Sequence, residues 1–527
     1  MAIYPGNPGI AFTPAVCHKQ WMHCTLRTFF VCWALVGAAA CTYLPRLDDS
    51  PVSQALPAQA ADRIAAALPL EGGDVQRCLL LDTPGSALEW RLALIDAADR
   101  SIDAQYYVWE GKSGNLLIDR VLAAADRGVR VRILVDDIHI DGFREPLLAL
   151  DEHPNLEIRI FNPFGVRIRA PFGAIRLLEM AVDGNRLNHR MHNKVLMVDG
   201  RVAVFGGRNI GDAYYAMDDE LNFLDMDVVF KGAAVADMAT GFDLYWNSRW
   251  SYPVTAIEPI PLFRSSIERI QPGIRRQIEE DAELSAYAAR TDWVPVLRGL
   301  DDGVAVDGIE VIYDLPEVGW FQHPEQMADR LAEVGSQIQR SVQIVSPYLV
   351  PTQRQLELLE ALRARDVRVS VLTNSLASND VTLANAAYSK YRQQLLEAGV
   401  ELYELRPDAQ LLPATSGAKR SRRLSLHRKF MIFDDDLVYV GSMNLDPRSV
   451  TLNTELGALI RSTALAETLR RSFAESTASD NAWRVTLDDG VVHWRAGAEV
   501  SDREPSLGLL QRLANWFYKL LPVSRQV

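Results

Sequence analysis

Two copies of one pattern of histidine, lysine and aspartate stand out in this chain of 527 residues. In each copy the lysine lies two residues after the histidine and the aspartate seven residues after it, as His192, Lys194 and Asp199 and again as His427, Lys429 and Asp434. With average residue frequencies, about 0.02 such patterns are expected by chance in a chain with this many histidines. The pair therefore predicts one catalytic site that is assembled from both halves of the chain.

These residue types suit the cleavage of a phosphodiester, which needs a nucleophile, an acid for the leaving alkoxide and fixed positive charge. One histidine can attack phosphorus and form a phosphohistidine. The other can protonate the leaving alcohol and then deprotonate the acceptor. The lysines supply charge that a metal ion would otherwise provide, so we expect neither a metal nor another cofactor. His189, three residues before His192, is expected to form a polar wall of the pocket.

A glycine-containing stretch follows each motif, Gly206–Asn209 in the first half and Gly441–Asn444 in the second. We expect each histidine and lysine to project from one face of a strand, because side chains alternate along strands. The aspartate should then close that strand at a turn, and the glycines should admit a second strand. Asn209, Asn444 and Ser442 are predicted to donate hydrogen bonds to the substrate phosphate.

Each imidazole should also need a carboxylate that orients it. Glu455 is the candidate in the second half, and Asp225 occupies the equivalent strand in the first half. The sequence leaves open which carboxylate serves which histidine. Asp199 and Asp434 belong to the predicted catalytic motif, but they are expected to hold their loops together rather than to touch phosphate.

The elements around the motifs occur twice. A strand at 101–109, a helix at 116–127 and a strand at 129–135 are matched by a strand at 341–346, a helix at 353–365 and a strand at 367–373. Strand–helix–strand units of this size favour parallel pairing with helices on the sheet faces. The sequence therefore predicts an α/β fold of two similar domains, residues 71–300 and 301–505.

The composition limits the classes of function. Hydrophobic residues make up 48% and charged residues 23% of the chain, as in ordinary globular proteins. The formal net charge of −13 argues against a general nucleic-acid binder, because phosphate backbones are held mainly by lysine and arginine. A local basic patch must therefore attract any anionic substrate.

The first 41 residues resemble a bacterial lipoprotein signal peptide. An uncharged apolar run at 29–40 has the length of a signal-peptide core, whereas a membrane span needs about 20 apolar residues. The run ends in Gly-Ala-Ala-Ala before Cys41, the expected site of lipidation. Residues 42–70 are predicted to form a tether, which would place the protein in the cell envelope as a membrane-anchored lipoprotein. An uncleaved signal anchor is the alternative.

Two other segments are candidates for contact with lipid. Residues 506–527 carry leucine and aromatic residues at helical spacing, which predicts an amphipathic helix either in a membrane interface or packed on the second domain. A basic run precedes the second motif and is either a solvated surface or a contact with anionic lipid; its candidate residues are Lys419, Arg420, Arg422 and Arg423.

The longer strings around the motifs resemble one family. Phe161–Phe164, Arg190–Lys194, Gly206–Gly211 and Asn444–Ser449 are similar to the phospholipase D superfamily, in its bacterial cardiolipin synthase C-like branch. The resemblance implies two phospholipase-D-type domains, each a mixed, mostly parallel sheet flanked by helices, with the active site at their interface. It also implies that His192 is the nucleophile and His427 the acid and base. At Asn385–Tyr388 the chain departs from the His-Ala-Gly-Tyr of many relatives, which affects the expected acceptor.

The leading hypothesis is a phosphatidyltransferase that makes cardiolipin from phosphatidylglycerol and a second phospholipid, with phosphatidylethanolamine as a candidate donor. The alternative is a phospholipase D that hydrolyses phospholipids to phosphatidic acid. A nuclease is less favoured because the chain is acidic. An inactive lipid-binding scaffold is less favoured because both motifs are intact. The expected partners are phospholipid substrates and a membrane but no nucleic acid, and an accessory protein is left open.

Overall fold

The computed structural model describes residues 44, 51–59, 63–69, 76–139, 144–165, 179, 183–257, 266–316, 326–411 and 422–521. The chain divides into two compact units, Met1–Arg46 with Phe164–Leu187, and Leu47–Pro163 with Asn188–Val527. Both motif copies lie in the second unit. The predicted signal peptide and its Cys41 lie outside the described residues.

The first half of the chain builds a mixed sheet. Its strands are β1 (Gln76–Leu81), β2 (Ser101–Tyr106), β3 (Arg130–Asp136), β4 (Leu156–Phe161), β6 (Val195–Val198), β7 (Val202–Gly206), β9 (Asp227–Lys231), β10 (Ser251–Pro253) and β11 (Val304–Val306). In the described residues their order is β10-β4-β3-β2-β6-β7-β9-β1-β11. Strand β11 lies at one edge of this sheet, where it pairs with β1.

The second half repeats this plan. Its strands are β12 (Gly308–Tyr313), β13 (Ser341–Val345), β14 (Arg368–Asn374), β15 (Glu401–Leu405), β17 (Phe430–Phe433), β18 (Leu437–Gly441), β20 (Leu456–Arg461), β21 (Ala482–Asp488), β22 (Val491–Ala496) and β23 (Glu499–Ser501). Over the described ranges their order is β12-β20-β18-β17-β13-β14-β15-β21-β22-β23. The two sheets therefore share a central run of equivalent strands.

The predicted mixed sheets are confirmed, but the expectation that they are mostly parallel is wrong. In the described part of the two large sheets, parallel pairing is confined to β2, β3 and β4 and to β13, β14 and β15. The remaining pairs of these sheets are antiparallel, among them the hairpins β6–β7 and β17–β18, which follow the motif lysines and join the sheets beside β2 and β13.

The helices of the described residues alternate with these strands along the chain. They are α2 (Arg63–Ala67), α3 (Pro84–Ala97), α4 (Gly111–Asp126), η1 (Asp137–His139), α5 (Arg144–Leu150), α7 (Gly184–Asn188), η2 (Asp212–Tyr215), α8 (Ala234–Trp246), α9 (Val254–Ile257), α10 (Ile267–Glu280), α11 (Ala282–Ala289), α12 (Val294–Arg298), α13 (Gln326–Gln337), α14 (Gln353–Arg363), α15 (Thr382–Tyr388), α16 (Arg392–Glu397), α17 (Pro447–Thr451), α18 (Thr463–Ser476) and α19 (Leu509–Lys519). Local sequence sets their starts: Thr352 and Gln355 form a capping box on α14.

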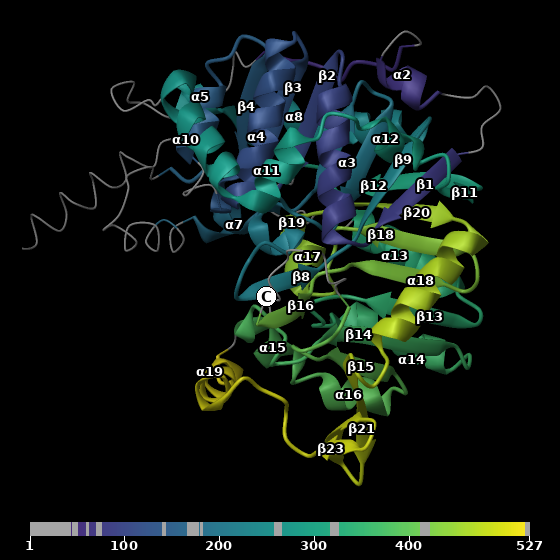
Figure 1. The fold of residues 1–527 in the computed structure, drawn as a ribbon. Helices are drawn as coiled ribbons and strands as arrows, with labels where there is room; N and C mark the ends of the chain where they lie inside the picture. The colour runs from purple at the N-terminus through teal and green to yellow at the C-terminus, as the bar shows by residue number, and fades with distance from the viewer. Residues whose placement is uncertain are drawn as a thin grey trace, which may run out of the picture. The chain divides into compact units, whose positions relative to one another are not determined.

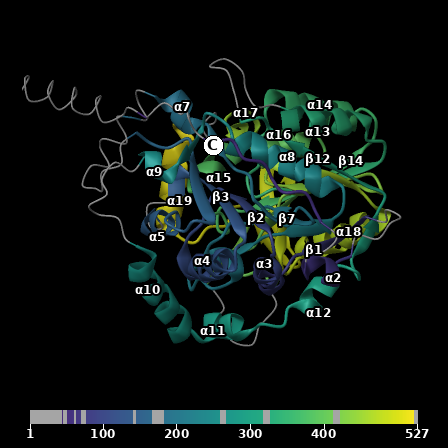
Figure 2. The ribbon, with the colours of Figure 1, turned by 90° about the horizontal axis from the view of Figure 1, so that it is seen from above.

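One hydrophobic core joins the two halves. Buried side chains from β6, β7 and β9 pack in a single cluster with those from β17, β18 and β20, together with side chains from α8 and α18. On the outer side of the first sheet lie α3 and α4 (Figure 1). Figure 2 shows α10, α11 and α12 following one another across these two helices. The halves are therefore held together by apolar burial, the main stabilising effect in folded proteins.

Two short parallel sheets also join the halves, each with one strand from either side. Strand β5 (Arg190–Met191) pairs with β19 (Asn453–Thr454), and β8 (Leu221–Leu224) pairs with β16 (Arg423–Leu426). Each of these strands ends directly before a candidate site residue.

Part of the predicted tether lies against the first domain. Arg132 Nη1 donates to Ser53 O at 3.1 Å, and Ala55 N donates to Asp243 Oδ2 at 2.8 Å. Ile64 of α2 is fully buried. Residues 51–59 and 63–69 therefore differ from a free linker, because polar side chains of the domain bind their backbone.

Candidate active site

The histidine and lysine of each motif lie between two strands, and not on one strand as predicted. His192 to Lys194 connect β5 to β6, and His427 to Lys429 connect β16 to β17. At this point the chain leaves a short sheet shared with the other half and enters its own large sheet. The connectors are held by backbone bonds: His192 N donates to Thr454 O and His427 N donates to Leu224 O, both at 2.8 Å.

A polar side chain at the end of a central strand supports each connector. Asp136, at the end of β3, accepts a hydrogen bond from Met191 N at 3.0 Å. Asn374, at the end of the equivalent β14, accepts one from Leu426 N at 2.8 Å and donates to Leu426 O at 2.9 Å. Burial raises the pKa of Asp136 to about 6. The residue before each motif histidine is thus fixed to the sheet.

Each imidazole is paired with a carboxylate from the opposite half. His192 Nδ1 lies 2.8 Å and 3.0 Å from the two carboxylate oxygens of Glu455. His427 Nδ1 lies 2.6 Å from Asp225 Oδ2. The short parallel sheets produce this crossing, because two aligned parallel strands place the residues that follow them side by side.

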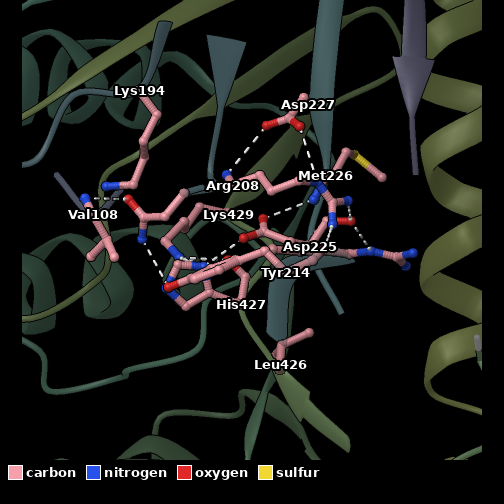
Figure 3. Close-up of polar contacts among 12 residues, drawn as sticks. Val108, Lys194, Arg208, Tyr214, Asp225, Met226, Asp227, Leu426, His427 and Lys429 are labelled. Atoms are coloured by element: carbon pink, nitrogen blue, oxygen red, sulfur yellow. Dashed lines mark hydrogen bonds and ion pairs between the residues drawn. The ribbon is translucent and has the colours of Figure 1, made fainter. Parts of the chain in front are cut away.

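Asp225 is held from several sides (Figure 3). Arg208 Nη2 donates to its carbonyl oxygen at 2.9 Å, while Arg208 Nε binds Asp227 Oδ2 at 3.1 Å. A Cβ on Gly207 would lie 2.4 Å from Asp225 Oδ1, so this position has no room for a side chain. Burial opposes ionisation of Asp225, but His427 and a neighbouring lysine outweigh it and lower the pKa of Asp225 to about 2.

The two pairs differ in their electrostatics. Burial raises the pKa of Glu455 to about 7, despite Lys194 nearby. Burial also lowers the pKa of His192 well below its usual value, and the neighbouring lysines lower it further. Burial and a lysine lower the pKa of His427 to about 4, although Asp225 opposes this. His192 is therefore the stronger candidate for a neutral nucleophile, and His427 is the easier of the two to protonate.

Both motif lysines are buried beside the histidines. Lys194 Nζ donates to His192 O, and Lys429 Nζ donates to His427 O. Burial lowers the pKa of Lys194 well below its usual value and that of Lys429 to about 8. Burial therefore disfavours the charged form of both lysines, and an anionic phosphate bound beside them would stabilise that form.

We expect the affinity of the site for sulfate, a dianion that does not titrate near neutrality, to fall as the pH rises through about 8. Lys429 is charged below its pKa and neutral above it, so the loss should approach tenfold per pH unit beyond that value. Calorimetric titration at constant ionic strength would measure it. The Lys429→Met variant should bind sulfate weakly at every pH, and a parent affinity that is constant from pH 7 to 10 would contradict the expectation.

A cavity of about 460 Å³ opens over the two histidines. Aromatic rings form much of its wall: the Tyr107 ring lies 4.9 Å from the His192 ring, and the Tyr214 and Phe223 rings lie 5.2 Å and 5.1 Å from that of His427. Tyr107 directly follows the buried strand β2, and its side chain lines the cavity. The same cavity is lined by Tyr348 and Asp380, which no motif indicates, and by Asp446 and Arg448 of the string Asn444–Ser449.

The predicted phosphate-binding residues take different positions. Asn209 and Asn444 line the cavity, where Asn209 Nδ2 donates to Tyr214 Oη at 2.8 Å and Asn444 Nδ2 donates to Ser449 Oγ at 3.3 Å. Ser442 differs from its prediction, because its hydroxyl is buried and donates to Glu455. It therefore helps to hold the orienting carboxylate.

Asp199 and Asp434 lie at turns beyond the motif strands, with φ of 53° and 47°. Asp199 accepts hydrogen bonds from the backbone N–H groups of residues 99, 100 and 101 at 2.8–3.0 Å. Asp434 accepts the matching bonds from residues 339, 340 and 341 at 2.7–3.1 Å. Both carboxylates anchor the start of a neighbouring central strand, β2 or β13, which is the geometry of the loop-holding role expected for them.

His189 lies behind the site. Its ring nitrogens contact Leu452 O and Pro316 O of the second half, each at 3.2 Å. It does not line the cavity over the histidines, in contrast to the prediction. Within the described ranges, no cluster of three or more histidine, cysteine or acidic residues is arranged to hold a metal ion.

Of the basic run, Lys419 and Arg420 lie outside the described residues. Arg422 is exposed and pairs with Glu220 at 3.4 Å, and Arg423 belongs to β16. Among the described helices, none combines the length and apolar character that a membrane crossing requires.

Comparisons with known proteins identify the family of the chain. A family model described as "Cardiolipin synthase, PLD-like domain" matches residues 92–246 and 335–477, once in each half. The chain is 36% identical over 474 residues to "Cardiolipin synthase C" of Escherichia coli (strain K12), covering 87% of this chain and 98% of that one. It is 25% identical over 383 residues to a "Cardiolipin synthase" of Staphylococcus aureus (strain Mu50), covering 72% and 62%.

A solved structure shares the fold. The crystal structure of phosphatidylserine synthase from Haemophilus influenzae Rd KW20 superposes with a TM-score of 0.55 at 15% identity, covering 93% of this chain and 98% of that one.

Proposed function

Because the chain belongs to the phospholipase D superfamily, in its cardiolipin synthase branch, we propose that it is a phosphatidyltransferase that makes cardiolipin from phosphatidylglycerol and a second phospholipid. The observation that carries the proposal is the crossed site: two imidazoles, each held by a carboxylate of the opposite half, facing one cavity. Two such histidines can carry a phosphatidyl group from one alcohol to another.

In the first step, His192 attacks phosphorus. Glu455 holds its Nδ1, so Nε2 is the nitrogen that forms the N–P bond. The bond from phosphorus to the headgroup oxygen breaks, and His427 donates a proton to that oxygen. The headgroup alcohol leaves, and the phosphatidyl group stays on His192.

In the second step, the reaction reverses with a new alcohol. His427, now neutral, takes the proton from a hydroxyl of phosphatidylglycerol. The hydroxyl oxygen attacks phosphorus, the N–P bond breaks, and cardiolipin leaves. If water takes the place of this hydroxyl, the product is phosphatidic acid, so the same residues would serve a phospholipase D.

The assignment of roles rests on the two carboxylates. Asp225 is fully ionised near neutral pH, and so stabilises a positive charge on His427. Glu455, with a pKa of about 7, supports a charge on His192 less well. The pKa of His427 is about 4, but a bound phosphodiester would add negative charge beside it and raise that value. His427 is therefore the acid and base, and His192 is the nucleophile.

The cavity wall favours a donor with a cationic headgroup. Asp380 and Asp446 line the cavity, and the Asp380 carboxylate accepts a hydrogen bond from Tyr348 at 2.9 Å. Acidic groups beside aromatic rings attract an ammonium group. Phosphatidylethanolamine is the candidate donor that fits this description.

Lipid product analysis tests the proposal. We expect the full chain to make cardiolipin from vesicles that contain phosphatidylglycerol and phosphatidylethanolamine. Omitting phosphatidylethanolamine should lower the yield and so identify it as the donor. The His192→Ala variant should make no cardiolipin. Phosphatidic acid as the sole product would favour the hydrolase, and an active His192→Ala variant would refute the mechanism.

A further inference from the structure

The apolar side chains of α19 face outward. Seven of the fourteen exposed large hydrophobic residues in the described part of the chain lie between positions 507 and 520. We define the α19 apolar face as Leu509, Leu510, Leu513, Trp516, Phe517 and Leu520. Leu510 is 84% exposed and Trp516 is 62% exposed. A contiguous exposed apolar surface of this kind marks a site of interaction.

The polar side of α19 faces the protein. Asn515 is buried and accepts a hydrogen bond from Asn385 Nδ2 at 3.3 Å. Gln511 Nε2 donates to Leu376 O at 2.7 Å. Glu504 joins this contact by accepting from Asn385 Nδ2 at 3.0 Å and from Arg392 at 2.7 Å. Polar bonds therefore hold the helix in place while its apolar face remains uncovered by the described residues.

The departure at Asn385 has a structural role in this contact. Asn385 lies on α15, and its amide binds the C-terminal segment instead of lining the active-site cavity. Figure 1 shows α19, in yellow, beside α15. Two other residues of α15, Leu383 and Ala384, line the active-site cavity. One short helix thus contacts both the cavity and α19.

A basic pocket lies beside the apolar face. Its volume is about 260 Å³, and Arg503, Arg512 and Lys519 line it together with Trp516. Glu504 also lines this pocket, with its carboxylate 3.6 Å from Lys519 Nζ. Cations next to an apolar surface suit an anionic headgroup above acyl chains.

We propose that α19 docks the enzyme on an anionic phospholipid surface, with its apolar face among the acyl chains and the basic pocket at the headgroups. The helix has eleven residues and is about 16 Å long, far short of a bilayer core, so it lies in the plane of the interface. Because α15 lies between α19 and the cavity, docking holds the cavity close to the surface that carries the lipid substrates. The choice of a lipid surface rests on the proposed function.

Quenching of Trp516 fluorescence tests this docking. The full chain is reconstituted into vesicles of phosphatidylglycerol with phosphatidylcholine whose acyl chains carry bromine. We expect the brominated acyl chains to quench part of the tryptophan fluorescence of the parent protein. The Trp516→Phe variant should not show this quenching. The Trp90→Phe variant is the control, because Trp90 is buried in α3, and it should keep the quenching. Equal quenching in parent and Trp516→Phe would overturn the proposal.

Two further variants keep Trp516 in place. Leu510→Glu with Phe517→Glu should abolish the quenching of Trp516, whereas Val491→Glu with Val500→Glu, at exposed apolar positions elsewhere, should retain it. Arg503→Gln with Arg512→Gln should raise the fraction of phosphatidylglycerol in the vesicles that is needed for quenching of Trp516. Each lost cation should weaken binding to the anionic vesicles about fivefold. Quenching as strong on neutral vesicles would overturn the role of the basic pocket.

The docking test uses no enzymatic readout. Quenching without cardiolipin formation would support docking and contradict the proposed function. Cardiolipin formation without quenching of Trp516 would support the function and overturn the docking.

Discussion

Replacing His427 with alanine is expected to slow transfer from natural phospholipids by about 10⁴-fold or more, the loss seen when a member of a catalytic unit is removed. The variant should nevertheless still attack a phosphodiester whose leaving group is 4-nitrophenolate. This leaving group departs without a proton, so it needs no acid. His192, the proposed nucleophile, and its partner Glu455 remain intact in the variant.

The measurement is a rapid-quench experiment with the 4-nitrophenyl substrate. In His427→Ala, one equivalent of 4-nitrophenolate should be released in a burst, and the phosphorylated enzyme should accumulate because no base activates the acceptor. His192→Ala is the matched control and should give neither burst nor phosphoenzyme. If His192→Ala gave the burst and His427→Ala did not, the two roles would be exchanged.

The second large effect concerns the crossed carboxylates. Asp225→Asn and Glu455→Gln should each lower kcat on phospholipid by about 10³- to 10⁴-fold, because an amide cannot stabilise an imidazolium and favours the wrong tautomer. The two variants should differ on the 4-nitrophenyl substrate. Asp225→Asn impairs the acid, so its burst should be largely preserved. Glu455→Gln impairs the nucleophile, so its burst should be slow.

Double variants check the partners directly. Asp225→Asn should lower kcat little further in a His427→Ala background, because the effects of replacing residues that act as a unit are not additive. In a His192→Ala background, Glu455→Gln should likewise cost little more. Thermal unfolding of each variant separates catalytic loss from loss of fold. If Asp225→Asn behaved instead as a partner of His192, the crossed geometry would not operate in catalysis.

Much of the fold could be predicted from the sequence because it is local. The strand–helix–strand unit of β2, α4 and β3 and its equivalent β13, α14 and β14 lie close to their predicted ranges, and turn and cap residues mark their ends. The direction of the remaining strands could not be predicted. Antiparallel pairs such as β6 with β2 join residues about ninety positions apart, and no local pattern encodes that partner.

The cavity wall was the part of the site that sequence reasoning missed. Tyr107 lies one residue beyond β2 and faces the cavity, although its apolar neighbours favour a core position. Tyr348 and Asp380 belong to loops with no motif. The one sequence feature that indicates these residues is their position after the carboxyl end of a central strand. In α/β folds, functional sites tend to form at this end of the sheet.

Two histidines and two lysines in a repeated motif predict phosphoryl transfer before the fold is known. Which carboxylate serves which histidine depends on the fold. Glu455 lies 263 positions from His192, and Asp225 lies 202 positions from His427. Spacing along the chain carries no information about such contacts. They arise because β5 pairs with β19 and β8 with β16, and apolar burial between the two large sheets holds those strands in register.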